Sequence, residues 1–240
     1  MPAQLTARKG QHVCAINPQA SKLFDRGRAL FLEEAKLLST LKHPNIVSVL
    51  DFFLANGTAY LVMNYEYGTT LGHWLKNQDN LVDSAFLLDV FPPIMRCIKN
   101  MHNRNLLHLD IKPDNILLRP ENNPLILDFG SAMPFKNELP ARSHSMTNGY
   151  AAPEQHQENT LIGPWSDIYA IGASMRACLD RKKPPTANDK DALRVFKSAF
   201  KQYKGQFEPR LLQAIDWAMQ ANPAKRTQTI DDLLHAIHYL

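Results

Sequence analysis

The segment HLDIKPDNILL at residues 108–118 constrains this chain more than any other stretch. Its three polar residues Asp110, Lys112 and Asn115 have a spacing that fits neither one helix face nor one strand face. Pro113 lies among them and blocks a regular helix interior, and the apolar run 116–118 indicates a short strand. The sequence therefore predicts a stiff loop, anchored by a strand, that holds a carboxylate, an ammonium and an amide close together.

The composition is that of an ordinary soluble globular protein. The chain has 240 residues, of which 45% are hydrophobic and 21% charged, which excludes a disordered chain and suits one large domain or two lobes of a single unit. The formal net charge is only +4, and the Lys and Arg residues are scattered, so no nucleic-acid partner is expected. The closest approach to a basic run, residues 181–183, is interpreted as a solvated loop.

The cysteines, the histidines and the apolar stretches indicate which kinds of site and which cellular location to expect. The three cysteines lie far apart and are odd in number, which predicts free thiols in a reducing compartment and favours a cytoplasmic location. The nine histidines are dispersed without the spacing of a zinc site. No apolar stretch reaches the length of a membrane span, and no signal peptide is expected at the start.

Hydrophobic periodicity predicts a small strand-bearing piece at residues 1–66. A helix is expected over 22–41 with Glu34 close to its apolar face, and strands are expected over 46–53 and 59–65. The dipeptide Asn56-Gly57 between the strands is typical of a hairpin turn. The apolar face of the helix is expected to consist of Leu30, Leu37, Leu38 and Leu41.

A larger and mainly helical piece is expected at residues 67–240, after a hinge near 64–70. Pro92-Pro93 indicates the first turn of a helix, since proline suits that position. Short strands are predicted over 116–118 and 125–127, before a long irregular stretch up to residue 154. The other predicted helices cover 71–76, 165–179, 190–203, 209–219 and 229–239.

Asp128-Phe129-Gly130 follows the second of these short strands. A carboxylate at a strand end beside a glycine can turn outward toward a ligand. Together with Asn115 it offers two hard oxygen donors, the ligand type that Mg²⁺ takes when phosphates supply the rest. Asp110 would then aim at a substrate hydroxyl, and Lys112 would offset charge on the transferred phosphoryl group. This arrangement predicts phosphoryl transfer, which depends on placement and electrostatics more than on covalent chemistry.

With these motifs the chain resembles a eukaryotic-type serine/threonine protein kinase of a bacterial-like subgroup. The HxDxKxxN loop at 108–115, the DFG triplet at 128–130 and Ala152-Pro153-Glu154 within GYAAPEQ occur in the family's order. The segment WSDIY at 165–169, which includes Asp167, resembles the start of the helix that anchors the catalytic loop. The segment NPAKR at 222–226 resembles the late motif whose arginine, here Arg226, pairs with Glu154.

The resemblance implies an α+β, protein-kinase-like fold. Residues 1–66 would be a partial N-lobe, helix C plus a β-hairpin, and residues 67–240 a mainly helical C-lobe with the catalytic loop and activation segment. It also implies ATP and Mg²⁺ as cofactors, and a serine or threonine hydroxyl of a protein as the acceptor.

The resemblance further implies a role for each site residue. Asp110 would be the catalytic base, with Lys112 beside it, and Asn115 and Asp128 would hold Mg²⁺. Thr147 would brace Asp110. The residues implied to contact the nucleotide are Glu34 of helix C, the gatekeeper Met63, the hinge residues Asn64, Tyr65 and Glu66, and Leu117 beneath the adenine ring.

Two features depart from the family pattern. Leu109 stands where most kinases have an arginine that pairs with a phosphate on the activation segment, so ordering by that route is not expected. No glycine-rich loop and no VAIK-type lysine precede Glu34. The segment HVCAIN at 12–17 only superficially resembles the lysine motif, and the subgroup pattern places Met1 just after the lysine. We therefore expect little or no kinase activity from this chain, and apolar residues of its two strands should be exposed.

Two alternative functions remain open. One is a non-catalytic pseudokinase that binds a partner. The weaker one is a small-molecule phosphotransferase, which Lys112, Ala152-Pro153-Glu154 and the SDIY segment disfavour, because these features suit a peptide substrate. Ser143 and Ser145 are interpreted as part of a solvated loop.

Overall fold

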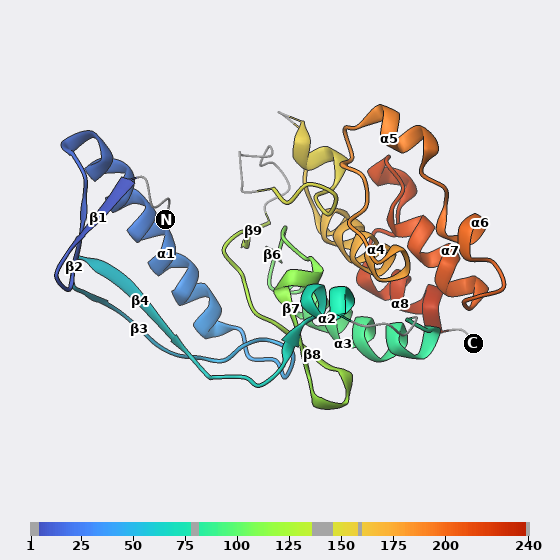
Figure 1. Cartoon of the computed structure of the whole chain (residues 1–240), viewed down its shortest axis with the longest axis horizontal. Coiled ribbons are helices and arrows are strands. Elements are labelled where there is room, and N and C mark those ends of the chain that lie inside the picture. The colour runs from blue at the N-terminus through green and yellow to red at the C-terminus, as the bar shows by residue number, and fades with distance from the viewer. Residues whose placement is uncertain (1–4, 78–81, 136–145, 158–159, 239–240) are drawn as a thin grey trace. The chain divides into compact units, whose positions relative to one another are not determined.

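The computed structural model describes residues 5–77, 82–135, 146–157 and 160–238. The chain divides into two compact units, Met1–Glu66 and Tyr67–Leu240 (Figure 1). Each unit is described by itself.

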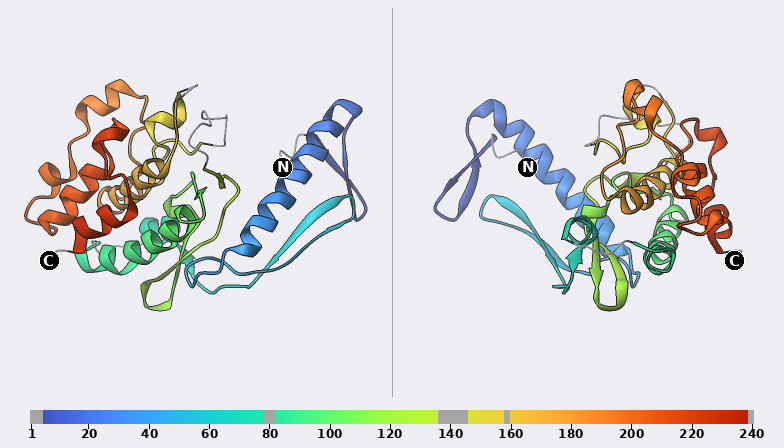
Figure 2. Two further views of the ribbon diagram at one scale, coloured as in Figure 1. Left: turned by 180° about the vertical axis from the view of Figure 1, so that it is seen from behind. Right: turned by 45° about the vertical axis from the view of Figure 1, so that its right-hand side comes forward.

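The first unit consists of two β-hairpins and one long helix. Strand β1 (Thr6–Lys9) pairs with β2 (His12–Ala15), and β3 (Val49–Ala55) pairs with β4 (Thr58–Met63), both antiparallel. Helix α1 (Pro18–Thr40) lies alongside the β3–β4 hairpin, as the two views in Figure 2 show.

The turn between β3 and β4 has the form that its sequence predicts. Asn56 and Gly57 have φ values of 51° and 73°, both in the left-handed region that a type I′ turn requires. The amide of Val13 donates a hydrogen bond to the Asn56 carbonyl at 2.9 Å, so the first hairpin packs against this turn. Residue 57 must be glycine here, because a Cβ atom would lie 2.4 Å from the Val13 carbonyl oxygen.

Helix α1 begins earlier than predicted, and its buried face is turned. The Asn17 side chain accepts a hydrogen bond from the Ala20 amide at 2.8 Å and caps the helix, with Pro18 in the first turn. The prediction that Leu30 lies on the apolar face is wrong, since Leu30 is 55% exposed. At about 100° per residue, the buried positions are centred roughly a quarter turn away from it. They are Ala20, Phe24, Ala35 and Leu38.

The second unit is built around helix α4 (Pro164–Asp180), whose residues 166–179 are all buried. Around it pack α3 (Ser84–His102), α7 (Pro209–Ala218) and α8 (Ile230–His238). Helices α2 (Leu71–Asn77), α5 (Lys190–Val195) and α6 (Ala199–Tyr203) are shorter. Among the described helices none combines the length and apolarity that a membrane crossing needs.

Two small sheets frame the loop that carries the polar residues. Strands β5 (Thr69–Thr70), β7 (Ile116–Arg119) and β8 (Asn123–Ile126) form an antiparallel sheet in the order β5-β7-β8. Strand β6 (Leu106–Leu107) pairs with β9 (Met133–Pro134). The loop between β6 and β7 is therefore fixed at both ends.

Two helix predictions in this unit are wrong. Helix α3 does not begin at Pro92-Pro93 but at Ser84, where the Asp83 side chain accepts a hydrogen bond from the Phe86 amide at 2.8 Å. Buried apolar side chains before and after the two prolines stabilise the helix across them. The single helix predicted over 190–203 is two helices, because Ser198 caps α6 by accepting from the Lys201 amide at 3.2 Å.

Candidate active site

The polar loop is organised by a 3₁₀ turn at Pro113–Asn115. The Asn115 amide donates to the Lys112 carbonyl at 2.9 Å and closes the turn. The Asn115 carbonyl accepts from the Leu127 amide at 3.0 Å, which fixes the loop beside the end of β8. The residue after Leu127 is Asp128, so the pairing of β7 with β8 brings the two predicted metal ligands to the same end of the hairpin.

Asp110 is the centre of a converging set of side chains. Its Oδ2 accepts hydrogen bonds from Lys112 Nζ at 2.6 Å and from Asn115 Nδ2 at 3.0 Å. Its Oδ1 accepts from Thr147 Oγ1 at 2.6 Å, and Lys112 Nζ also donates to Thr147 Oγ1 at 2.8 Å. The Asp110 side chain is only 12% exposed, so these donors hold one orientation of the carboxylate.

The two predicted metal ligands keep one oxygen each for a ligand. Asn115 Nδ2 is engaged by Asp110, and Asp128 Oδ1 accepts from the Gly130 amide at 2.9 Å. Within the described residues, Asn115 Oδ1 and Asp128 Oδ2 make no hydrogen bond. Carboxylate and amide oxygens suit Mg²⁺ when phosphate oxygens complete its shell, so these residues fit the ion. Among the residues that the structure describes, no group of three or more His, Cys, Asp or Glu side chains is placed to hold a metal ion by itself.

Asp167, at the start of α4, anchors the backbone of the loop that carries Asp110. The fully buried carboxylate accepts hydrogen bonds from the backbone amides of His108 at 3.0 Å and Leu109 at 2.7 Å, and lies 2.8 Å from His102 Nε2. Burial alone would raise the pKa of Asp167, but the hydrogen bonds and charge of His102 and the His108 interactions outweigh it and hold the pKa below its usual value. Asp167 therefore acts as a negatively charged clamp on the loop backbone.

His108 has a packing and hydrogen-bonding position. Its ring lies 5.0 Å from the Phe129 ring, and its Nδ1 faces the Asp110 amide at 3.3 Å. Burial lowers the pKa of His108, so the neutral ring can accept that hydrogen bond. The ring thereby links the loop to the segment after β8.

A second anchor joins residues far apart in the chain. Arg226 donates to both oxygens of Glu154, at 2.6 and 2.7 Å, and also to the Trp165 carbonyl at 3.0 Å. Ser166 Oγ donates to Glu154 at 2.9 Å. Both charged side chains are buried, and the bidentate geometry fixes residue 154 against the start of α4.

Comparison with known proteins decides the family. The profile of the protein kinase domain matches residues 5–238. The chain belongs to the protein kinase domain family. The α+β, kinase-like fold is confirmed by the solved structure of PpkA-294 in its apo form, with a TM-score of 0.86 and 29% identity, which covers 99% of this chain and 84% of that one.

Its curated relatives are serine/threonine-protein kinases, as predicted. Nek1 of Mus musculus is 29% identical over 221 residues, 90% of this chain and 18% of that protein. PrkC of Bacillus subtilis is 33% identical over 156 residues, 64% of this chain and 24% of that protein. Kinase D of Synechocystis is 25% identical over 222 residues, 88% of this chain and 42% of that protein. The chain thus spans less than half the length of each of these relatives.

Leu109 occupies an apolar environment in this kinase domain. It is 3% exposed and clusters with Leu107 and Ile162, with Met133 and Phe135 packed against them. Its backbone φ of 63° lies in the left-handed region, which costs a leucine about 1–2 kcal/mol. The hydrogen bond from its amide to Asp167 offsets this cost. Residues 133–135 are thus held here by apolar contacts and the β6–β9 pairing.

The predicted nucleotide-binding residues fall into two groups. Leu117 lies in β7 of the second unit and is 7% exposed. The others, Glu34 on α1, Met63 at the end of β4 and residues 64–66 after it, belong to the first unit. The amide of Asn64 donates to the Ser48 carbonyl at 2.9 Å, and Met63 is 41% exposed. That they meet the catalytic loop around a nucleotide stays a prediction.

Two residues of the site were missed from the sequence. His102, at the end of α3, is a side-chain partner of Asp167, and no local pattern indicates it. Gln155 donates to the Leu109 carbonyl at 3.3 Å and accepts from the Ala152 amide at 2.9 Å. Its place directly after Ala152-Pro153-Glu154 was the signal that could have found it. Ser143 and Ser145 lie outside the described residues.

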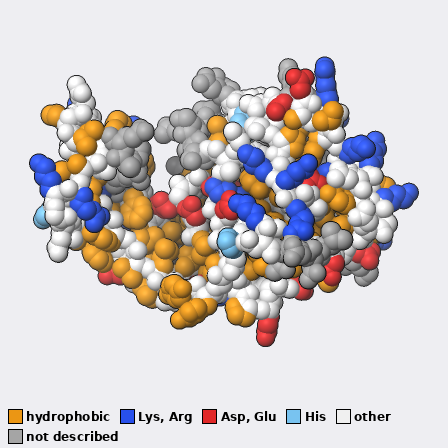
Figure 3. All heavy atoms as spheres, in the orientation of Figure 1, with side chains coloured by type: hydrophobic (Ala, Val, Ile, Leu, Met, Phe, Trp, Pro, Cys, Tyr) orange, Lys and Arg blue, Asp and Glu red, His pale blue; other side chains and the backbone are white. Residues whose placement is uncertain are grey.

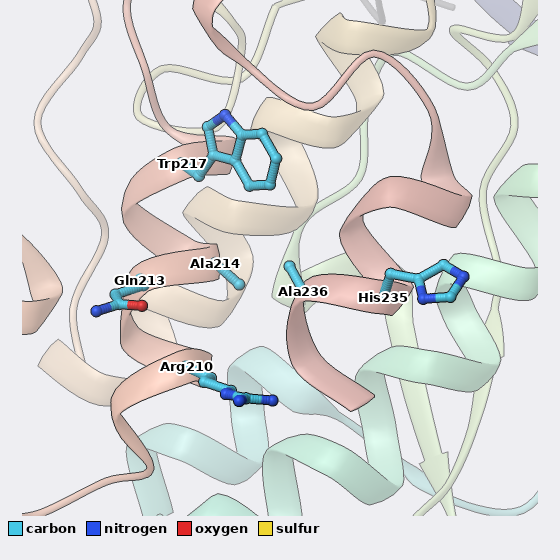
Figure 4. Close-up of a pocket in the computed structure, with 6 residues that line it drawn as sticks. All are labelled: Arg210, Gln213, Ala214, Trp217, His235 and Ala236. Atoms are coloured by element: carbon cyan, nitrogen blue, oxygen red, sulfur yellow. The ribbon is translucent and has the colours of Figure 1, made fainter. Parts of the chain in front are cut away.

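A cavity of about 530 Å³ lies away from the catalytic loop, between α7 and α8 (Figure 4). Its lining residues are Arg210, Gln213, Ala214, Trp217, His235 and Ala236. None of them is a predicted site residue, so this cavity plays no part in the candidate active site.

Proposed function

We propose that this kinase domain transfers the γ-phosphate of ATP to a serine or threonine hydroxyl of a protein. The observation that carries the proposal is the Asp110 carboxylate fixed by Lys112, Asn115 and Thr147. A small-molecule phosphotransferase would not explain why Thr147, from the activation segment, joins this set.

The hydrogen bonds around Asp110 leave room for one more donor. Two carboxylate oxygens offer about four lone-pair sites, and Oδ2 already accepts two hydrogen bonds while Oδ1 accepts one. The remaining site on Oδ1 is where a substrate hydroxyl would donate, and Asp110 would take up its proton as the oxygen attacks. Lys112 uses two of its three N–H groups and keeps one for the transferred phosphoryl group.

The remaining roles follow from the fit of the other residues. Asn115 Oδ1 and Asp128 Oδ2 would hold Mg²⁺, which would offset the negative charge of the ATP phosphates. Leu117 would lie beneath the adenine ring. Glu34 and residues 63–66 of the first unit would complete the nucleotide site.

A transfer assay tests the proposal. The 240-residue chain is incubated with Mg²⁺, radiolabelled ATP and dephosphorylated casein as acceptor. We expect slow transfer that falls by about 10²–10⁴-fold in Asp110→Asn, because the amide cannot accept the proton. Asp231→Asn, a surface change of the same chemistry, should keep the wild-type rate. Transfer that persists in Asp110→Asn would refute the assignment of the base.

A second candidate function is partner binding without catalysis. The observation that favours it is a set of exposed apolar side chains on β3 and β4. They are Leu50, Phe53, Leu54, Val62 and Met63, between 39% and 62% exposed. Thermal unfolding with and without Mg-ATP separates the two functions. A ligand at 100 times its Kd adds about 2.7 kcal/mol to the stability of the native state, whereas a binding module without a nucleotide site would show no shift.

A further inference from the structure

The loop 181–183 between α4 and α5 has no role in the proposed catalysis, yet it borders a second cavity. This cavity has a volume of about 370 Å³, and Lys182, Lys183 and Lys197 lie among its lining residues. All three are exposed. Figure 3 shows that Lys and Arg side chains gather on the face of the second unit turned toward the viewer.

The floor of the cavity is electrically neutral. Arg176 and Asp180 form a buried ion pair, with Nε 2.9 Å from Oδ1 and both side chains at most 2% exposed. Tyr203 donates to the same carboxylate oxygen at 2.6 Å, and the Phe196 ring lies 4.3 Å from the Arg176 guanidinium. The Asp180 carboxylate in the cavity therefore already has an ion-pair partner and a hydrogen-bond donor.

The rim, by contrast, carries uncompensated positive charge. Within the described residues, none of the ammonium groups of Lys182, Lys183 and Lys197 has an ion-pair partner. Val195, which is 78% exposed, adds an apolar surface beside them. The cavity thus combines three cations with an apolar wall, which is complementary to a peptide that carries carboxylates.

The basic rim is connected to the catalytic base through the activation segment. Thr147 bonds to Asp110, and Gly149 follows two residues later, with a φ of 91°. A Cβ atom on Gly149 would lie 2.6 Å from Lys183 Cγ and 2.5 Å from the Pro184 carbonyl oxygen, so the backbone of Gly149 is packed on this loop. Two residues span at most about 7 Å, and an extended peptide advances about 3.3 Å per residue. A substrate with its hydroxyl at Asp110 would reach the Lys183 side chain, and with it the edge of the rim, within about two to four residues.

We infer that the Lys182–Lys183–Lys197 rim binds acidic residues of the protein substrate, two to four positions from the hydroxyl that receives phosphate. This inference rests on the proposed function for its direction from Asp110. An exposed ion pair contributes modestly, so specificity arises from the sum of several pairs and weakens with salt.

The test compares two fluorescein-labelled peptides of one sequence with a single serine. The first has glutamates two to four positions on each side of the serine, and the second has glutamines there. Kd values are measured by fluorescence anisotropy at 50 mM and 500 mM NaCl. We expect the acidic peptide to bind about 3- to 20-fold more tightly at low salt, and the ratio to fall toward one at high salt.

Two lysine variants form a matched pair. Lys183→Gln keeps carbon atoms at the Cγ and Cδ positions that pack on Gly149, and replaces the charged end of the side chain with a neutral amide. It should reduce the preference for the acidic peptide by about 2- to 5-fold. Lys225→Gln removes an equal charge from an exposed lysine that does not line the cavity, and should leave the preference unchanged.

The outcomes are separable from the proposed function, because the binding readout needs no turnover. If neither peptide is phosphorylated but the Kd ratio behaves as expected, the transfer proposal fails and the rim assignment stands. Equal Kd values for both peptides, or equal effects of the two lysine variants, would overturn the rim assignment. It would also be overturned if a single-stranded oligonucleotide lost affinity in Lys183→Gln while the peptide ratio did not change, since the rim would then recognise phosphates.

Discussion

Replacing Asp167 with asparagine should weaken the second unit and disturb the loop that carries Asp110. The asparagine oxygen can still accept from His102 and the His108 amide, which share Oδ2 in the native protein. Its NH₂ group would then face the Leu109 amide, which now donates to Oδ1 at 2.7 Å. Two donors would be opposed in a fully buried place.

The expected loss of unfolding free energy is about 2–4 kcal/mol at pH 7. It combines one charge-assisted hydrogen bond with one buried N–H left unsatisfied. The same N–H belongs to Leu109, whose φ of 63° is held by this bond, so the loop should relax and phosphate transfer should slow as well. A loss of this size lowers Tm by roughly 5–15 °C.

Tryptophan fluorescence during urea unfolding measures the effect on the correct unit. The chain has three tryptophans, Trp74, Trp165 and Trp217, and all of them lie in the second unit. Asp231→Asn is the control, because it breaks only an exposed pair with Lys99 and should cost at most about 1 kcal/mol. A loss below about 1 kcal/mol in Asp167→Asn would refute the role of the carboxylate as a clamp.

The contribution of Asp167 to the stability of the fold should depend on pH with a definite sign. The folded pKa of Asp167 is lowered from its ordinary value of 3.8, so its charge stabilises the fold above the unfolded pKa, and this contribution is lost as the pH falls through the folded pKa. The difference in unfolding free energy between wild type and Asp167→Asn should therefore shrink as the pH falls below about 4. A difference that is unchanged down to pH 3 would contradict this electrostatic reasoning.

Two further substitutions probe the other anchors by the same urea titration. Arg226→Met should lower the unfolding free energy by about 3–5 kcal/mol, because Glu154 would stay buried without its cation. Adding Glu154→Leu to this variant should recover most of the loss. If Arg226→Met alone stayed within about 1 kcal/mol of wild type, the result would be inconsistent with a buried ion pair. Leu109→Arg should lower the unfolding free energy by about 2 kcal/mol or more, since it places a charge among Leu107, Ile162 and their apolar neighbours. Leu109→Met, the control, should lower it by less than about 1.5 kcal/mol. Equal stability of the two variants would show that the cluster does not exclude charge.

The elements that the sequence predicts well are those set by neighbouring residues. The stiff loop around Asp110 follows from Pro113 and the short apolar run after it, and the β3–β4 turn follows from Asn56-Gly57. Both are local, so a short window contains the whole cause.

The elements that it does not predict depend on distant residues. The β6–β9 pair joins residues 106–107 to 133–134 over two residues each, which is too short for any periodic signal. The partner of Asp167 on α3, His102, becomes visible only when α3 and α4 pack. The burial that carries α3 through Pro92-Pro93 is likewise tertiary, and local propensity points the other way.

The double proline inside α3 has a consequence for how the protein is made. Pro92 and Pro93 have no N–H, so the carbonyls of Leu88 and Asp89 have no donor four residues on, and burial of apolar side chains must hold the helix. Part of that burial comes from α8, more than a hundred residues later in the chain, with which α3 is in contact. During synthesis on the ribosome, α3 therefore emerges long before the surface that shapes it, and the second unit should complete its folding only after α8 has left the exit tunnel.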